Sequence, residues 1–422
     1  MSVEDRRFLD IMEKGIRFDN GHYTMPLPFR NERPMLPNNR HVALQRLRNL
    51  RKRLLRDGKL RSGFQTFMEN LLKNGHAERV PDPHLENDRV WYIPHHGVYH
   101  PKKPDKLRVV YDCSAKFHEE SLNSHLLQGP DLTNTLVGVL CRFRMENVAF
   151  TCDVEQMFHQ FRVSSEDRDY LRFLWYSDPE MLCPVEYRMC VHLFGATSSP
   201  GCANFGLKQV ARDNERKYGP DVANFLQREF YVDDGLASVP TADDAIRLIQ
   251  RSQSMCRDGG LRLHKFASSS REVIESIPLH DRTEGLSDVD IFGSSLQLER
   301  ALGVQWCVVS DTLRFHITLC DKPLTRRGVL ATVSSVYDPL GLIAPVILVA
   351  KQILQEMCRA HKDCDDPIPD NLRSRWERWR HDLPKLNLLE ISRCIKPKDF
   401  GEISSVQFHH FADASTTCYG QF

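Results

Sequence analysis

The alternation of apolar and polar residues divides the chain into segments of different character. Prolines at positions 26, 28, 34 and 37 predict an extended lead-in over residues 1–39, because proline cannot continue a long helix or a central strand. From Arg40 to Arg61, leucines at helical spacing predict an amphipathic helix with a dense positive face. That face is either solvated or in contact with phosphate groups, and the pattern favours neither reading.

Short runs rich in Val, Tyr, Phe and Trp dominate the next part of the chain, up to residue 194, and predict β-strands. The runs are RVWYIP, KLRVVYD, NVAFTCDV, LRFLWY and YRMCVHLF. Residues 201–228 and 241–258 have helical spacing and flank a hairpin around FYVDDGLASV. We therefore expect an α+β architecture, in which a mixed sheet is packed against helices.

The last third of the chain has a different pattern. A β-rich piece, VVSDTLRFHI, leads to the proline-punctuated apolar segment SVYDPLGLIAPVILVAKQIL and then to a helix that carries Trp376 and Trp379. The sequence closes with VQFHHFADASTTCYGQF and stops directly after a strand-like run. We expect this last domain to be cut short.

Composition and charge narrow the class of protein. With 422 residues the chain can form two or three domains, and 57 basic against 56 acidic residues mean that a nucleic-acid partner has to be argued from local patches. The 13 cysteines include no CxxC pair, which fits reduced thiols. No apolar run reaches the roughly 20 residues needed to span a bilayer. We expect an intracellular protein, cytoplasmic or nuclear, with no membrane partner and an oligomeric state left open.

Two adjacent aspartates, Asp233 and Asp234, occupy the tip of the expected hairpin. Each raises the proton affinity of the other unless a cation compensates both. Asp153 ends the apolar run NVAFTCD, where a strand would present it at the end of a sheet. Three such carboxylates suit Mg²⁺, and two ions, with Mn²⁺ as the alternative, would serve in-line phosphoryl transfer. Aspartate is also a common turn residue, so the pair alone is weak support.

Four motifs in order resemble those of reverse transcriptases. They are RVVYDCSA, FTCDVEQMFHQFRV, HLFGATSSP and FYVDD, the last similar to the YxDD signature. A narrower resemblance, to the polyprotein of Pao/BEL-type LTR retrotransposons, covers nearly the whole chain. It is carried by EDRDYLRFLWY, FGATSSPGCAN, GLRLHKFASSS, ALGVQW and SVYDPLGLIAPV.

The resemblance implies a right-hand polymerase fold, with fingers, a thumb or connection region, and a palm made of an antiparallel sheet and packed helices. The expected domains are an N-terminal lead-in and basic helix (1–80), the reverse transcriptase fingers and palm (81–300), the thumb/connection region (301–400) and the truncated start of a ribonuclease H-like domain (401–422).

By resemblance, catalysis falls to four residues. Asp153, Asp233 and Asp234 would form the metal-binding triad, with Asp153 and Asp233 as direct ligands of the two Mg²⁺ ions. Lys265 lies where such polymerases have a lysine near the leaving pyrophosphate, as a general acid, although a solvated lysine fits its position equally well.

The resemblance also implies two contacts to the triphosphate of the incoming nucleotide. Arg108 would bind phosphate oxygens, because a guanidinium can make bidentate contacts to them. Lys103 is expected to be the second contact. The short loop before Arg108 leaves Lys102 and Lys106 as alternatives.

A further set would hold the sugar and base of the nucleotide. Phe158, five residues after Asp153, would lie under the sugar, where its bulk excludes a 2′-hydroxyl. Phe194 and Gly195 would form the platform beside the nucleotide, glycine allowing close approach of the backbone.

HHFADAST, near the end of the sequence, resembles the first strand of a ribonuclease H domain. The resemblance makes Asp413 its first metal-binding carboxylate. One carboxylate cannot hold two ions, so we expect no ribonuclease H activity from this chain.

The leading hypothesis is an RNA-directed DNA polymerase that extends a primer on an RNA or DNA template with dNTPs. The alternatives are a truncated or domesticated retroelement remnant that binds primer and template without efficient catalysis, and another palm-type nucleotidyl transferase such as an RNA polymerase.

Overall fold

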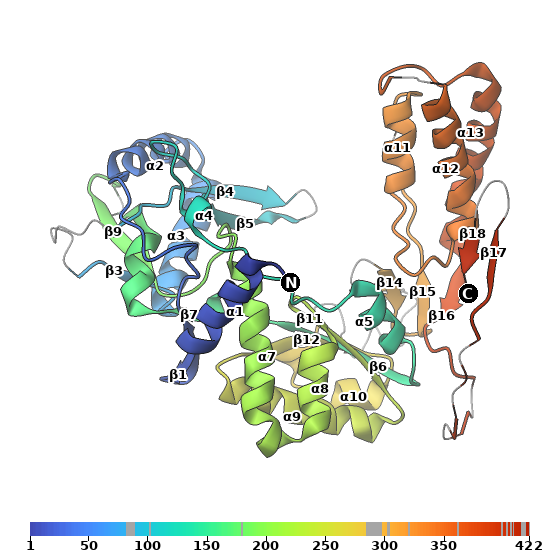
Figure 1. Ribbon diagram of the computed structural model, residues 1–422, viewed down its shortest axis with the longest axis horizontal. Coiled ribbons are helices and arrows are strands. Elements are labelled where there is room, and N and C mark those ends of the chain that lie inside the picture. Colours follow the sequence, from blue (N-terminus) through green and yellow to red (C-terminus); the bar gives the residue numbers. More distant parts are fainter. Residues whose placement is uncertain are drawn as a thin grey trace. The chain divides into compact units, whose positions relative to one another are not determined.

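The computed structural model is described for most of the chain (Figure 1). The described residues are 1–81, 89–100, 103–178, 180–283, 298–301, 304–319, 321–360, 363–397, 400–401, 404–405, 407, 409–414 and 419–421. They form two compact units. Unit 1 comprises Met1–Thr133, Asp153–Asp233 and Leu248–Leu263, and unit 2 comprises Asn134–Cys152, Asp234–Arg247 and His264–Phe422.

The first helix of unit 1, α1 (Val3–Gly15), corrects the expected lead-in. Ser2 and Asp5 form a capping box, in which each side chain accepts a hydrogen bond from the other residue's backbone N–H. Phe8 and Met12, four residues apart, are buried. The sequence prediction of an extended segment was wrong for this stretch because every proline that suggested it comes after the helix has ended.

The predicted basic helix is present but ends earlier than expected. Helix α2 (Arg40–Leu54) buries its leucine face, and a second helix, α3 (Gly58–Lys73), starts after a break. Asp57 causes the new start, because its side chain accepts a hydrogen bond from the Leu60 N–H as an N-cap. The stretch that reads as one helix is therefore two.

Apart from residues 230–231, the strands described in unit 1 form three small sheets. Their orders are β1-β2-β7, β3-β9-β8 and β4-β5. The strands are β1 (Arg17–Asp19), β2 (His22–Met25), β3 (Ala77–Arg79), β4 (His95–His100), β5 (Lys103–Tyr111), β7 (Arg162–Val163), β8 (Arg172–Tyr176) and β9 (Pro184–Met189). The runs KLRVVYD and LRFLWY match β5 and β8, and the front of YRMCVHLF matches β9.

The run RVWYIP is not a strand. It makes an isolated bridge, Tyr92 to Arg172, and the N–H groups of Trp91 and Ile93 bind carbonyls of the chain just before and within β8. Trp91 and Ile93 are buried. An apolar run is typical of buried segments as well as of paired strands, and this run is buried without forming a continuous strand.

In a hydrophobic core of unit 1, Phe64 of α3 stacks on Trp175 of β8 with ring centroids 5.6 Å apart. The expected helix 201–228 is interrupted at Gly219, whose φ of 92° ends the first helix. The helices and the short strand β10 are α4 (Leu122–His125), α6 (Met157–Gln160), α7 (Ser199–Tyr218), α8 (Pro220–Arg228) and β10 (Phe230–Tyr231).

Unit 2 contains most of the strands of a further, four-stranded sheet. Strands β11, β6 and β12 are neighbours in that order, and β10 precedes β11 in the hairpin that the sequence predicted. The elements, of which α9 lies mostly in unit 1, are β6 (Val148–Val154), β11 (Asp234–Val239), β12 (Leu263–Ser268), α5 (Leu136–Phe143), α9 (Ala242–Asp258) and α10 (Arg271–Glu275). Helix α9 lies where the sequence predicted it.

The rest of the described part of unit 2 contains a four-stranded sheet, three helices that lie side by side (Figure 1) and a short strand pair. Trp376 and Trp379 stack with centroids 5.1 Å apart in the core between the helices. The elements are β13 (Leu298–Ala301), β14 (Val304–Cys307), β15 (Thr312–Arg314), α11 (Arg326–Ser334), α12 (Ala344–Arg359), α13 (Asp370–Asp382), β16 (Glu390–Ser392), β17 (Ala412–Ala414) and β18 (Tyr419–Gln421).

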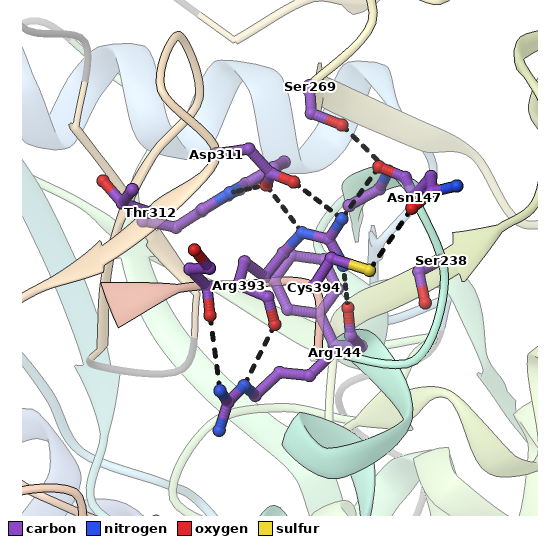
Figure 2. A network of polar contacts seen from close by, with 12 residues as sticks. Arg144, Asn147, Ser238, Ser269, Asp311, Thr312, Arg393 and Cys394 are labelled. Carbon is purple, nitrogen blue, oxygen red and sulfur yellow. Dashed lines mark hydrogen bonds and ion pairs between the residues drawn. The ribbon is translucent and has the colours of Figure 1, made fainter. Parts of the chain in front are cut away.

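A fully buried arginine fastens this sheet to the turn before β6 (Figure 2). The guanidinium of Arg393 forms a bidentate ion pair with Asp311, at 2.6 and 2.8 Å, and donates hydrogen bonds to the carbonyl oxygens of Phe143, Glu146 and Asn147. In return Arg144 donates to the Arg393 carbonyl at 3.0 Å. We call this network the Arg393 clasp.

None of the described helices is long and apolar enough to cross a membrane. The described cysteines are free thiols, as the sequence predicted.

Candidate active site

The predicted catalytic carboxylates lie at the ends of two strands. Asp153 is the last residue but one of β6, and the burial pattern along that strand leaves it half-exposed between buried Cys152 and Val154. Asp234 is the first residue of β11 and is also half-exposed, as is Asp233 before it. Polar side chains therefore project at the positions where the sequence predicted metal ligands.

A backbone hydrogen bond joins these two places within unit 1. The N–H of Val154 donates to the carbonyl oxygen of Asp233 at 2.9 Å. On the next residue, the N–H of Glu155 donates to the Arg262 carbonyl, and the two side chains form an ion pair at 2.8 Å. Asp153 and Asp233, separated by 79 intervening residues, are thus brought to adjoining positions of the backbone.

The backbone beside the predicted carboxylates departs from ordinary geometry. Val232, directly before Asp233, has a φ of 59°, which a β-branched residue rarely adopts. Gln156, three residues after Asp153, has a φ of 47°. In unit 2, Lys265 has a φ of 52°. Such conformations cost of order 1–3 kcal/mol each and concentrate at functional sites.

The carboxylates do not form a ready-made cage. Within the described part of the chain, no group of three or more His, Cys, Asp or Glu side chains is arranged to hold a metal ion by itself. Mg²⁺ in phosphoryl-transfer sites needs only one or two protein carboxylates, because water and substrate phosphates complete its shell. The hard oxygen donors of Asp153 and Asp233 fit that ion.

Two predicted nucleotide-binding aromatics meet. The rings of Phe158 and Phe194 are 4.4 Å apart between centroids, at an interplanar angle of 63°. Phe158 is only 9% exposed, whereas Phe194 is 59% exposed and covers it. The surface that this pair presents to solvent is therefore mainly that of Phe194, a distinction that the sequence did not reveal.

Pairing of two distant segments brings these rings together. The N–H of Val163 donates to the Cys190 carbonyl at 2.8 Å, and the N–H of His192 donates to the Phe161 carbonyl at 3.0 Å. Phe158 lies just before one segment and Phe194 just after the other. The contact thus follows from the register of this pairing.

The glycine of the platform is required by its surroundings. Gly195 has a φ of 116°, and a Cβ there would collide with the carbonyl oxygen of Tyr111 at the end of β5. This close approach places the platform beside the segment RVVYDCSA, which carries Arg108 and Asp112.

Asn123, which sequence reasoning missed, fastens these two segments. Its side-chain amide donates to the Gly195 carbonyl and to Ser114 Oγ, both at 2.9 Å, while its oxygen accepts from the Thr197 N–H at 2.9 Å. It belongs to the one-turn helix α4, and a single sequence contains no signal that distinguishes it from a capping asparagine.

His192 adds an unusual buried group two residues before the platform. It is 1% exposed, and neither ring nitrogen has a hydrogen-bond partner among the described residues. Burial lowers the pKa of His192 to about 4, so the ring is neutral near pH 7. Burial likewise lowers the pKa of His159, in α6 beside Phe158, to about 4.

The other predicted residues are placed as follows. Arg108 is exposed in β5, opposite Val98. Lys103 also lies in β5, but its side chain and that of Lys106 are outside the described part, as is all of Lys102.

Two further predicted residues lie in unit 2. Lys265 is exposed in β12, and its carbonyl accepts a hydrogen bond from Thr283 at 3.0 Å. Asp413 lies in β17 opposite Gly420, with its side chain outside the described part.

Comparison with known proteins adds two findings. The family model described as the Pao retrotransposon-like RNaseH-like domain matches residues 325–422. Among solved structures, the chain resembles the foamy viral protease-reverse transcriptase dRH in complex with double-stranded DNA, with a TM-score of 0.51 and 13% identity, over 78% of this chain and 49% of that one. No curated protein matches.

These findings agree with the motifs. The match over residues 325–422 supports the resemblance to Pao/BEL-type retrotransposons that the motifs suggested. The fold of the chain is reverse-transcriptase-like, and the chain spans about half the length of the foamy viral chain. The family match begins at Thr325, the N-cap of α11, inside the segment predicted as thumb or connection.

Proposed function

We propose that the chain is an RNA-directed DNA polymerase, which extends a primer 3′-hydroxyl by nucleotidyl transfer. The observation that carries the proposal is the hydrogen bond from Val154 to Asp233, because it sets Asp153 beside the aspartate pair of the YxDD-like turn. A reverse-transcriptase-like fold supports the same reading.

In this proposal Asp153 and Asp233 would hold Mg²⁺, with Asp234 completing the carboxylate set. Two bound ions would lower the pKa of the attacking 3′-hydroxyl and neutralise charge on the leaving pyrophosphate. The residues of the chain orient the reactants: Arg108 binds the triphosphate, with a lysine of the 102–106 segment as its partner. Lys265 is proposed to donate a proton to the leaving group.

The aromatic pair is proposed to select the sugar. Phe194 presents its ring at the proposed platform and lies against buried Phe158, so close packing prevents the two rings from moving into the core. A 2′-hydroxyl would therefore clash with the ring of Phe194. Gly195 lets the backbone approach the nucleotide. The nucleotides are then dNTPs, and the partner is a primed RNA or DNA template. The foamy viral neighbour is itself a complex with double-stranded DNA.

Primer extension tests the proposal. Wild type and Asp233→Asn are compared on a primed RNA template with Mg²⁺ and dNTPs, together with Asp19→Asn, an exposed aspartate at the end of β1, as the matched control. We expect extension by wild type and by the control, and a loss on the order of 10³-fold in Asp233→Asn with unchanged hybrid binding. Equal extension by all three proteins would refute the catalytic role of Asp233.

The second candidate, a remnant that binds primer and template without turnover, makes a different prediction. A remnant of this kind should bind the primer–template hybrid but should extend no primer at any tested concentration of Mg²⁺ or Mn²⁺. The strained backbone retained at Val232 favours the enzyme, because strain of this kind persists where function maintains it.

A further inference from the structure

A cavity in unit 1 shares no lining residue with the proposed nucleotide site. Its volume is about 500 Å³, and it is bounded by the start of α2, the end of β3 and the beginning of β9. We call it the Glu186 cavity, after the carboxylate that lines it. A volume in this range suits a small organic ligand and exceeds what one water molecule or one ion needs.

The carboxylate of Glu186 is buried and fully engaged. It accepts hydrogen bonds from Arg40 Nε at 2.6 Å, from the Tyr92 hydroxyl at 2.7 Å and from Arg172 Nη1 at 3.3 Å. Tyr92 and Arg172 are buried as well. Because three donors hold Glu186, its negative charge is compensated within the protein and does not favour a cation as the ligand.

The charged groups around the cavity have a positive surplus. Ion pairs of 2.6 to 3.4 Å link four arginines and three carboxylates into one network. The arginines are Arg40, Arg168, Arg172 and Arg188, and the carboxylates are Glu78, Asp169 and Glu186. Arg79 also lines the cavity, so five positive charges stand against three negative ones. A surplus of two positive charges favours a ligand with two negative charges.

Two arginines that line the cavity have N–H groups left for a ligand. Among the described residues, the side chain of Arg40 donates only through Nε, to Glu186, and the side chain of Arg79 has no hydrogen-bond partner. A guanidinium carries five N–H groups in a planar fork that fits two oxygens of one phosphate. Since Arg40 and Arg79 line the same cavity, one anion can receive donors from both.

The rest of the lining is mainly apolar. Val80 is buried, and Pro184 and Val185 are half-buried at the beginning of β9. The hydroxyl of Tyr92 is already bonded to Glu186, so its ring is what remains for contact with a ligand. An inorganic ion would leave these apolar surfaces in water, whereas a ligand with an apolar body would cover them.

We propose that the Glu186 cavity binds a phosphate monoester carried on a small apolar or aromatic body. The phosphate would lie between Arg40 and Arg79, and the body would lie against Val80 and Val185. A phosphate monoester has close to two negative charges at pH 7, which matches the surplus, whereas a phosphodiester has one. The inference concerns a separate site and does not depend on the proposed polymerase function.

Isothermal titration calorimetry on the full 422-residue chain tests the ligand class, with EDTA present to prevent Mg²⁺-dependent nucleotide binding. The probes are phenyl phosphate and AMP, which separate an aryl phosphate from a nucleotide as the source of the monoester. We expect at least one probe to bind about 10-fold more tightly than inorganic phosphate, because its body covers the apolar lining. Methyl phenyl phosphate, a diester with one charge, should bind about 10-fold more weakly than phenyl phosphate.

Variants test the position of the site. Arg79→Gln removes one charge at an exposed position, so the fold should persist while the tighter-binding probe loses about 10-fold in affinity. Arg216→Gln, at an exposed position of α7, is the matched control and should bind as wild type does. Asp233→Asn should also bind as wild type does, because the proposed catalytic carboxylates do not line this cavity.

Four results would each overturn the proposal. They are the absence of binding by both probes at millimolar concentration, binding of inorganic phosphate as tight as that of the better probe, unchanged affinity in Arg79→Gln, and an equal loss of affinity in Arg216→Gln or Asp233→Asn. Failure of primer extension by wild type would contradict only the polymerase proposal, because the calorimetry reports binding without any turnover.

Discussion

The ring of Phe194 lies edge-on against the ring of Phe158, with centroids 4.4 Å apart, and shields it from solvent. Phe158 is buried and Phe194 is exposed, so in the proposed site the two residues would contribute differently, which their expected places under the sugar and at the platform did not indicate. In the proposed site, Phe158 would support the wall and Phe194 would form its surface. A change at either residue should therefore affect the choice of sugar.

The first prediction concerns this pair. Phe158→Val leaves a gap under Phe194, so the preference for dNTPs over rNTPs should fall by about 10-fold or more. Single-nucleotide incorporation with each substrate measures it. Phe173→Val, which removes a similar buried ring from β8, is the control and should cost stability without changing the preference. Unchanged discrimination in Phe158→Val would remove sugar selection from the pair.

A second prediction concerns Asn123. Asn123→Ala removes the bonds to Gly195 and Thr197, so the platform should loosen and the KM for dNTPs should rise by about 10-fold, with a smaller change in kcat. Steady-state incorporation kinetics measure both constants. Asn39→Ala is a matched control, because Asn39 also makes two side-chain bonds to backbone, both to Tyr92 at 2.8 Å. If both variants raise KM alike, Asn123 acts only through stability.

The Arg393 clasp leads to a third prediction (Figure 2). Arg393→Ala removes the guanidinium partner of Asp311 and the donor to the carbonyl oxygens of Phe143, Glu146 and Asn147, so the free energy of unfolding should fall by about 3–5 kcal/mol. Urea unfolding followed by tryptophan fluorescence reports it, since Trp306 also bonds Asp311, at 2.8 Å. Arg373→Ala, which removes an exposed ion pair with Glu377, should cost less than about 1 kcal/mol. If Arg393→Ala also lowered the free energy of unfolding by less than about 1 kcal/mol, the Arg393 clasp would not be a principal stabilising contact.

The fourth prediction concerns pH. Burial lowers the pKa of His95, His159 and His192 to about 4, from an ordinary value of 6.5. Each is held neutral in the folded state, so the unfolded chain binds more protons between these values. Stability should be fully present above pH 6.5 and should fall toward pH 4, by up to about 1.4 kcal/mol per pH unit for each histidine.

His192→Leu isolates one contribution to this acid sensitivity. The substitution removes two unpaired ring nitrogens from the core, so stability at pH 7.5 should be maintained or increased, and its decline by pH 5.5 should be shallower than in wild type. Urea unfolding at the two pH values measures this. His41→Leu, at an exposed position, should keep the wild-type pH dependence. A decline as steep in His192→Leu as in wild type would contradict the assignment.

The sequence by itself determined the local elements and the order of the motifs. Strands β5, β6 and β8 and helix α9 follow from short-range periodicity, and so does the FYVDD hairpin, because apolar spacing and turn residues act within a few positions of the chain. The sequence prediction was wrong at α1, because prolines that follow the helix were given more weight than its capping box. It was also wrong at RVWYIP, where a buried segment was predicted to be a paired strand.

The tertiary structure alone decided which residues meet. The approach of Val154 to Asp233, the covering of Phe158 by Phe194, the bridge made by Asn123 and the burial of Arg393 all join residues that are remote in the sequence. Each depends on the register between distant segments, which is set by packing and by the need to pair buried polar groups. No local pattern encodes that register, so these relationships appear only when the whole chain is folded.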